Sequence, residues 1–125
     1  MNDREIIIRN YVAGYNAYDV EKMVADFDEH IIFENILDGK TTLIITGLIA
    51  FKIQAQQALT YFSERMQIIK SFTDLESSCK VEIDYRAILA TDLSESLTKG
   101  QELKLKRTSI FEFNGHKISK LTDIS

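Results

Sequence analysis

The sequence has few of the residues on which special structural or chemical roles usually depend. None of its 125 residues is proline and five are glycine, so turns must be built from Gly, Asn, Asp and Ser. Cys79 is the only cysteine, which excludes an internal disulfide, and no histidine lies near it to support a nucleophilic role. His30 and His116 have no partner at ligand spacing, so we expect no metal site.

Long apolar runs and an excess of basic residues are also absent. No stretch approaches the roughly 18 apolar residues of a membrane span, and the first residues do not resemble a secretory signal. We therefore expect a cytoplasmic protein with no membrane partner. The net charge is −4, and phosphate binding needs a concentrated basic surface, so we expect no nucleic-acid partner. No phosphate loop or dinucleotide motif is present, and we expect no cofactor.

Apolar spacing predicts three helices. Spacings of three and four residues indicate a helix over 4–17, and Asp19 is well placed to cap a short second helix that ends near Phe27. A third, long helix is predicted from Gly47 for about five turns. Its apolar face would comprise Leu48, Phe51, Ala55, Ala58, Leu59, Phe62 and Met66.

Alternating residues predict strands in the rest of the chain. A short hairpin is expected over 31–45, with Asp38-Gly39 as its turn, and a closing hairpin over 102–124 around Asn114-Gly115. Further strands are expected over 67–75 and 80–92. Helices followed by a meander of strands predict an α+β fold with an antiparallel sheet, in one domain that spans residues 1–125.

The predicted strand over 102–113 departs from a simple alternation of apolar and polar residues. Leu103, Leu105, Phe111 and Phe113 share one side with Arg107 and Ser109. An arginine and a hydroxyl on an apolar side indicate that this side faces a cavity and not a solid core. The opposite face of the predicted sheet carries Ile88, Ala90 and Ile110 among charged residues, and we interpret it as a partner surface.

Four segments resemble the NTF2-like superfamily, and most closely its SnoaL-like and ketosteroid-isomerase-like branch. They are a helix that ends in Tyr-Asn-Ala-x-Asp (15–19), a Val-x-x-Met-x-x-x-Phe helix (20–27), a glycine before the long helix, and a closing Phe-x-Phe-x-Gly-x-x-Ile hairpin (111–118). The resemblance implies a cone in which a curved sheet wraps the long helix and leaves an apolar pocket at its open end. It also implies dimerisation through the outer sheet face.

The resemblance implies specific positions for catalytic residues. Isomerases of this branch use a carboxylate base, and a tyrosine with a protonated aspartic acid as the oxyanion hole. The tyrosine position falls on Tyr11, but the base and acid positions fall on Asn35 and Ser109. An amide cannot accept the proton, so steroid isomerisation is not expected. The cyclases of the branch place an acid/base aspartate five residues after the Ile of Gly-x-x-Ile, which is Asp123.

We therefore expect a pocket that binds a small apolar or aromatic molecule. If the protein is an enzyme, cofactor-free cyclisation, isomerisation or dehydration of a carbonyl compound is expected, with Asp123 as acid/base and Tyr11 or Arg107 stabilising an oxyanion. A binding or assembly module without turnover is the alternative, and a collapsed pocket in a purely dimeric protein is a third. The ligand contacts expected besides these are Tyr15, Asn35, Phe62, Met66, Tyr85, Arg107 and Ser109.

Overall fold

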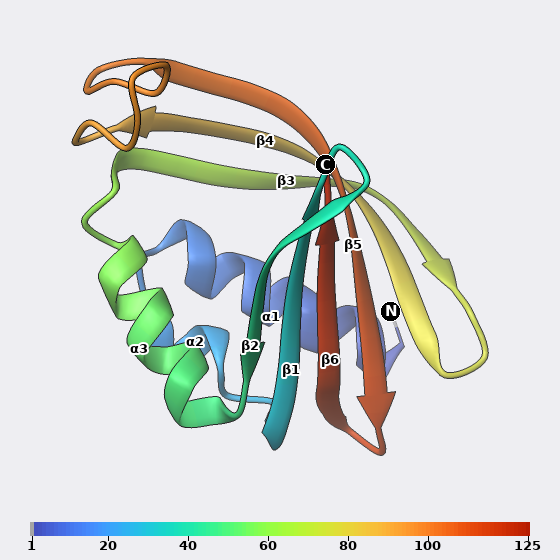
Figure 1. Cartoon of the computed structure of the whole chain (residues 1–125). Helices are drawn as coiled ribbons and strands as arrows, with labels where there is room; N and C mark the ends of the chain where they lie inside the picture. Colours follow the sequence, from blue (N-terminus) through green and yellow to red (C-terminus); the bar gives the residue numbers. More distant parts are fainter. Residues whose placement is uncertain (1) are drawn as a thin grey trace.

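The computed structural model describes residues 2–125 and contains three helices and six strands within them. In chain order these are α1 (Asp3–Asn16), α2 (Val20–Met23), β1 (Phe27–Leu37), β2 (Lys40–Thr46), α3 (Leu48–Ala58), β3 (Phe62–Asp74), β4 (Ser78–Leu89), β5 (Glu102–Asn114) and β6 (Lys117–Ile124). The helices lie on the concave side of one strongly curved sheet (Figure 1). The α+β class predicted from the sequence is therefore confirmed.

The sheet has the strand order β2-β1-β6-β5-β4-β3. Neighbouring strands are antiparallel, as expected, with the exception of β1 and β6, which run parallel to one another. This parallel pair joins the first hairpin to the closing hairpin. It brings the C-terminal end of β1 beside the last residues of the chain, a juxtaposition that the order of elements does not reveal.

Helix α1 forms where the apolar spacing predicts it, whereas α2 ends at Met23, and Phe27, the predicted end of this helix, is the first residue of β1. The Asp19 side chain accepts a hydrogen bond from the backbone N–H of Lys22 and so caps α2. Gly14 lies where α1 and α2 meet. A Cβ atom at this position would lie 2.7 Å from the backbone nitrogen of Met23, so only glycine allows the two helices to pack this closely.

The predicted long helix is too long by about two turns. Helix α3 ends at Ala58, and residues from Phe62 onward belong to strand β3. Phe62 pairs with Leu89, and Met66 pairs with Arg86, in an antiparallel ladder with β4. The apolar spacing of Phe62 and Met66 is compatible with a helix, but pairing with a neighbouring strand outweighs local spacing here. We correct their predicted helical placement accordingly.

Two-residue turns close the two hairpins. Leu37 pairs with Lys40, and the intervening Asp38 and Gly39 both have positive φ, as the favoured hairpin turn requires. The closing hairpin is also present, but Asn114 pairs with Lys117. Its turn is therefore formed by residues 115–116, one residue later than predicted.

The core lies between α1, α2, α3 and the concave face of the sheet. Ile8, Ile31, Phe111 and Leu121 are completely buried there. The outer face carries cross-strand ion pairs, among them Arg86–Glu102 at 2.9 Å. No helix within the described residues 2–125 combines the length and apolarity needed to cross a membrane.

Candidate functional site

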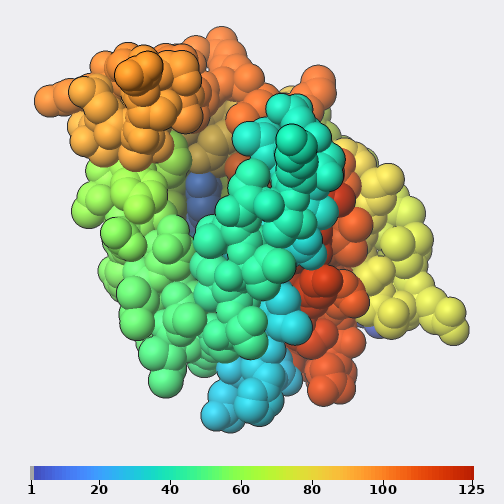
Figure 2. Space-filling view, in the orientation of Figure 1, coloured from blue at the N-terminus to red at the C-terminus, as the bar shows by residue number. Residues whose placement is uncertain are grey.

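An open cavity of about 370 Å³ lies on the concave side of the sheet. This volume falls within the range of roughly 300–1,000 Å³ that is usual for small-molecule sites. Figure 2 shows a recess between α3, β2 and the orange segment that precedes β5, with blue atoms of the N-terminal region at its bottom. The lining residues are Tyr11, Tyr15, Met23, Phe33, Asn35, Thr42, Leu43, Ile45, Phe51, Gln54, Ala55, Ala58, Tyr61, Phe62, Arg65, Tyr85, Arg107 and Asp123.

Three polar residues form a row across the sheet beneath this cavity. Asn35 of β1 pairs with Asp123 of β6, and Asp123 pairs with Ser109 of β5. Residues paired across neighbouring strands point to the same face of a sheet, so all three side chains share the concave side. The Ser109 hydroxyl donates a 2.6 Å hydrogen bond to Oδ1 of Asp123. Ser109 is buried behind the carboxyl group and does not itself line the cavity.

Arg107 is the cation nearest to the Asp123 carboxyl group. Its Nη1 lies 3.7 Å from Oδ2, and both side chains are largely buried. The guanidinium also lies over the Tyr85 ring, 4.4 Å from the ring centroid. Its Nε atom is buried and has no hydrogen-bond partner within the part of the chain that the structure describes. A buried donor without a partner is costly to the folded protein.

Burial controls the protonation of the acidic group in this row. The pKa of Asp123 is raised by burial, and the Arg107 charge and the Ser109 hydrogen bond oppose this shift without cancelling it. Asp123 is only 7% exposed. Asp123 is therefore easier to protonate than an ordinary surface aspartate.

Three tyrosines surround the Asp123–Arg107 pair. Burial raises the pKa of Tyr11 well above its usual value, and the Asp123 charge adds to the shift. The hydroxyl of Tyr11 therefore remains a hydrogen-bond donor, and its ring stacks on Phe27. The hydroxyls of Tyr15 and Tyr85 lie 2.8 Å apart, and burial raises the pKa of Tyr85 as well.

Arg65 is a site residue that sequence reasoning missed. It is only 5% exposed, and its Nε donates a 3.0 Å hydrogen bond to the backbone oxygen of Tyr15. The guanidinium lies between two aromatic rings, 3.7 Å from the centroid of Tyr15 and 4.7 Å from that of Tyr18. Asn16 holds this region together, because its side-chain amide bonds both the N–H and the C=O of Gln67.

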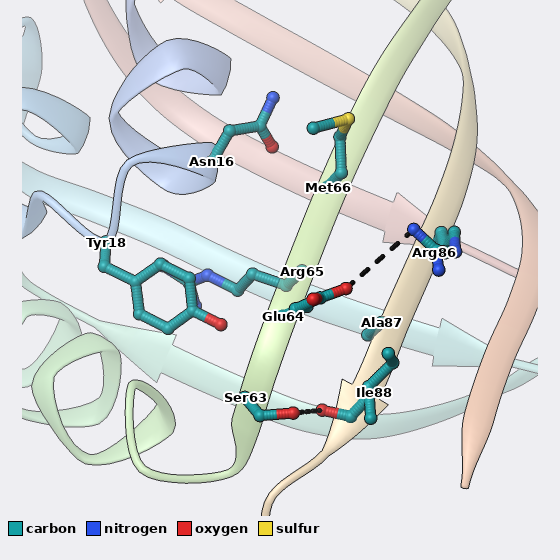
Figure 3. Close-up of a pocket in the computed structure, with 9 residues that line it drawn as sticks. All are labelled: Asn16, Tyr18, Ser63, Glu64, Arg65, Met66, Arg86, Ala87 and Ile88. Atoms are coloured by element: carbon teal, nitrogen blue, oxygen red, sulfur yellow. Dashed lines mark hydrogen bonds and ion pairs between the residues drawn. The ribbon is translucent and has the colours of Figure 1, made fainter. Parts of the chain in front are cut away.

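A second, smaller depression of about 230 Å³ lies next to Arg65, at the edge formed by β3 and β4 (Figure 3). Arg65 extends toward Tyr18, and both residues line this depression, whereas Glu64 forms an ion pair with Arg86. Met66 lines this depression and is 48% exposed. We therefore correct the predicted placement of Met66 in the ligand cavity.

The structure brings the other predicted contacts together. Tyr11, Tyr15, Asn35, Phe62, Tyr85, Arg107 and Asp123 line the cavity, and Ser109 contacts it through Asp123. The side-chain amide of Asn35 donates a 2.8 Å hydrogen bond to the Thr42 hydroxyl, so part of its hydrogen-bonding capacity is already used. Within residues 2–125, no group of three His, Cys, Asp or Glu side chains is arranged to hold a metal ion.

The curved sheet covers three helices and encloses a cavity whose walls are mainly aromatic, with polar residues at one end. This architecture is an α+β cone. Solved structures of this class resemble the chain along nearly its whole length. A candidate polyketide cyclase from Xanthomonas campestris pv. campestris superposes with a TM-score of 0.78 at 17% identity, covering 99% of this chain and 93% of that one.

Two further structures extend this similarity. An uncharacterised cystatin-fold protein from Novosphingobium aromaticivorans superposes with a TM-score of 0.77 at 19% identity, covering 100% of this chain and 99% of that one. An NTF2-like protein of unknown function from Burkholderia pseudomallei superposes with a TM-score of 0.74 at 14% identity, covering 98% of this chain and 90% of that one. The chain has the NTF2-like fold, as its sequence segments predicted, and identities this low show the fold alone. No protein-family model matches the sequence, and no curated protein does so either.

Proposed function

We propose that the protein binds a small, largely apolar organic molecule in its cavity and catalyses cofactor-free acid/base chemistry at a carbonyl group of that molecule. Cyclisation, isomerisation and dehydration are the reaction types that such a site can perform. One observation carries the proposal: a single carboxyl group, Asp123, lies in the wall of a cavity that is otherwise mainly aromatic and aliphatic. Similarity to a candidate polyketide cyclase supports it.

Asp123 is suited to move the proton. A general acid or base works best when its pKa lies near the working pH, and burial shifts this carboxyl group in that direction. Ser109 fixes Oδ1 by its hydrogen bond, whereas Oδ2 lies 3.7 Å from Arg107. That distance is too long for a hydrogen bond, so Oδ2 can form one with a reactant.

Tyr11 and Arg107 are suited to stabilise negative charge on the carbonyl oxygen. Tyr11 keeps its proton because burial raises its pKa, and a buried hydroxyl donor strengthens as charge develops on its acceptor. Arg107 supplies a fixed positive charge in the cavity wall. Steroid isomerisation is not proposed, because Asn35 is an amide and Ser109 a hydroxyl where that reaction needs carboxyl groups.

A binding module without turnover is the second candidate. It is favoured by the fact that Asp123 is the only carboxyl group among the residues that line the cavity. In this case Asp123 would serve to orient Arg107, and the cavity would hold its ligand unchanged. Both candidates require ligand binding in the cavity, and they differ only in the role of Asp123.

The variant Asp123→Asn separates the two candidates. A panel of apolar ketones and quinones is first screened by the shift in melting temperature, because a ligand that binds only the folded protein must stabilise it. Compounds that bind are then followed for conversion. We expect Asp123→Asn to retain binding within a few-fold and to lose conversion by a factor of about 100 or more.

Asp84→Asn serves as the matched control, because Asp84 lies on the exposed outer side of β4. It should leave both binding and conversion unchanged. Binding without conversion in the unmodified protein would favour the binding module. The absence of any melting-temperature shift across the panel would contradict both candidates.

A further inference from the structure

The cavity carries more positive than negative charge. Its charged lining residues are Arg65, Arg107 and Asp123. Asp123 lies in ion-pair contact with Arg107, whereas Arg65 forms no ion pair with any of residues 2–125. Burial of an unpaired charge is unfavourable, and proteins normally pair such a charge or bind an ion to it. Protonation of Asp123 would leave Arg107 without a counter-charge as well.

The two guanidinium groups flank one pair of tyrosines. Arg65 lies over the ring of Tyr15, and Arg107 lies over the ring of Tyr85. The two tyrosine hydroxyls are joined by a hydrogen bond of 2.8 Å. The arginines therefore approach the same end of the cavity from β3 and β5, on either side of a polar contact that is itself in the cavity wall.

The hydrogen bond that Arg65 makes to the chain does not explain a charge at this position. Its acceptor, the backbone oxygen of Tyr15, also accepts a hydrogen bond from the N–H of Tyr18. The carbonyl would therefore stay satisfied without the arginine. The rings of Tyr15 and Tyr18 attract the positive charge, and Nη2 lies 3.9 Å from Sδ of Met23. No carboxylate among residues 2–125, however, lies within ion-pair distance of Arg65 to balance its charge.

We propose that the ligand is an organic acid whose carboxylate binds between Arg65 and Arg107, with its apolar body against the aromatic walls of the cavity. The proposal rests on the proposed function and specifies the substrate class of the same site. Arginine suits this role because its planar group presents paired N–H donors that match a carboxylate. Phe33, Phe51 and Phe62 provide apolar surface for the body of the ligand.

Matched acid and amide pairs test this inference. Benzoate, phenylacetate and 2-naphthoate are each compared with the corresponding neutral amide by isothermal titration calorimetry. At least one acid should bind about tenfold or more tightly than its amide, because the amide keeps the shape but loses the charge. High salt should weaken the binding of the acid and leave the binding of the amide unchanged.

Substitutions then assign the preference to the two arginines. Arg65→Met and Arg107→Gln should each reduce the preference for the acid to about threefold or less, while amide binding stays the same. Arg65→Lys retains the positive charge and should retain part of the preference. Arg86→Gln is the matched control, since Arg86 lies on the outer face among Glu64 and Glu102, and it should change nothing.

The thermal stability of the ligand-free variants separates a binding role of Arg65 from a structural one. Arg65→Met removes a buried charge but also the hydrogen bond to Tyr15 and the contacts with two aromatic rings, so its melting temperature should fall only slightly. A marked decrease, with the acid preference intact in folded protein, would overturn the inference. Equal affinity for acids and amides would overturn it as well, while leaving the proposed cavity binding intact. Failure of acids, amides and ketones alike to bind would reject both proposals.

Discussion

The hydrogen bond from Ser109 to Asp123 provides a direct measure of the charge on the candidate catalytic group. Ser109 is 2% exposed and lies 2.6 Å from Oδ1 of Asp123. Ser109→Ala removes the donor and leaves the chain otherwise similar in size. A hydrogen bond to a charged group contributes about 1.5–3 kcal/mol, and one between neutral groups about 0.5–1.5 kcal/mol. The cost of the substitution therefore reports whether Asp123 is ionised.

The sign of the pH dependence follows from the direction of the pKa shift. Burial raises the pKa of Asp123 in the folded protein, so its contribution to stability is present below the ordinary aspartate pKa and is lost as pH rises through the folded-state pKa. Ser109 lowers this pKa, as does Arg107. Without Ser109 the folded-state pKa rises further, and the loss of stability toward high pH becomes larger. Ser109→Ala should therefore destabilise the protein by about 1 kcal/mol more at pH 8 than at pH 4.

Urea unfolding followed by circular dichroism at pH 4 and pH 8 measures this difference. With a denaturant dependence of about 1–3 kcal/mol per molar urea, 1 kcal/mol moves the midpoint by roughly half a molar. Ser71→Ala, at an exposed position on β3, is the matched control and should shift neither midpoint. A cost that is equal at both pH values would refute the reasoning, because Asp123 would then not change its charge between them.

Two further predictions concern packing and assembly. Gly14→Ala should destabilise the protein by about 1–2 kcal/mol in thermal unfolding, because the clash of its Cβ with Met23 outweighs the roughly 1 kcal/mol by which alanine favours a helix. A stabilised variant would mean that the two helices separate easily. Ala13→Gly is the control that measures the difference in helix propensity between alanine and glycine. If two copies associate through the outer sheet face, Ile110→Glu should halve the mass measured by light scattering. An unchanged mass would place any such contact elsewhere.

Local sequence patterns predicted the parts of the fold that local chemistry determines. Asp19 can cap only a helix that follows it, and its side chain accepts a hydrogen bond from the Lys22 amide in the first turn of α2. Asp38-Gly39 favours a two-residue hairpin turn because both residues accept positive φ. Alternation in β5 correctly placed Arg107 on the cavity side, since its apolar neighbours fix which face is inward.

Pairings between distant segments were beyond the reach of the same patterns. Asn35 and Asp123 are neighbours only because β1 and β6 run parallel at the centre of the sheet, and no turn links these two strands. The end of α3 was also misplaced for this reason. Residues 62–66 have apolar spacing that suits a helix, and only the presence of β4 beside them makes a strand the better arrangement.

Arg65 shows why part of the candidate site could not be predicted from the sequence. Phe62 pairs with Leu89, Glu64 with Ile88 and Arg65 with Ala87, so β3 contains one extra residue near Ser63. Such a bulge reverses which alternate residues face inward. Without it Glu64 would point to the cavity and Arg65 to solvent. The charge of the cavity wall, and with it the preference for an acidic ligand, thus depends on a single irregularity in an edge strand. An Arg65-dependent acid preference would therefore be strong evidence that this bulge persists in solution.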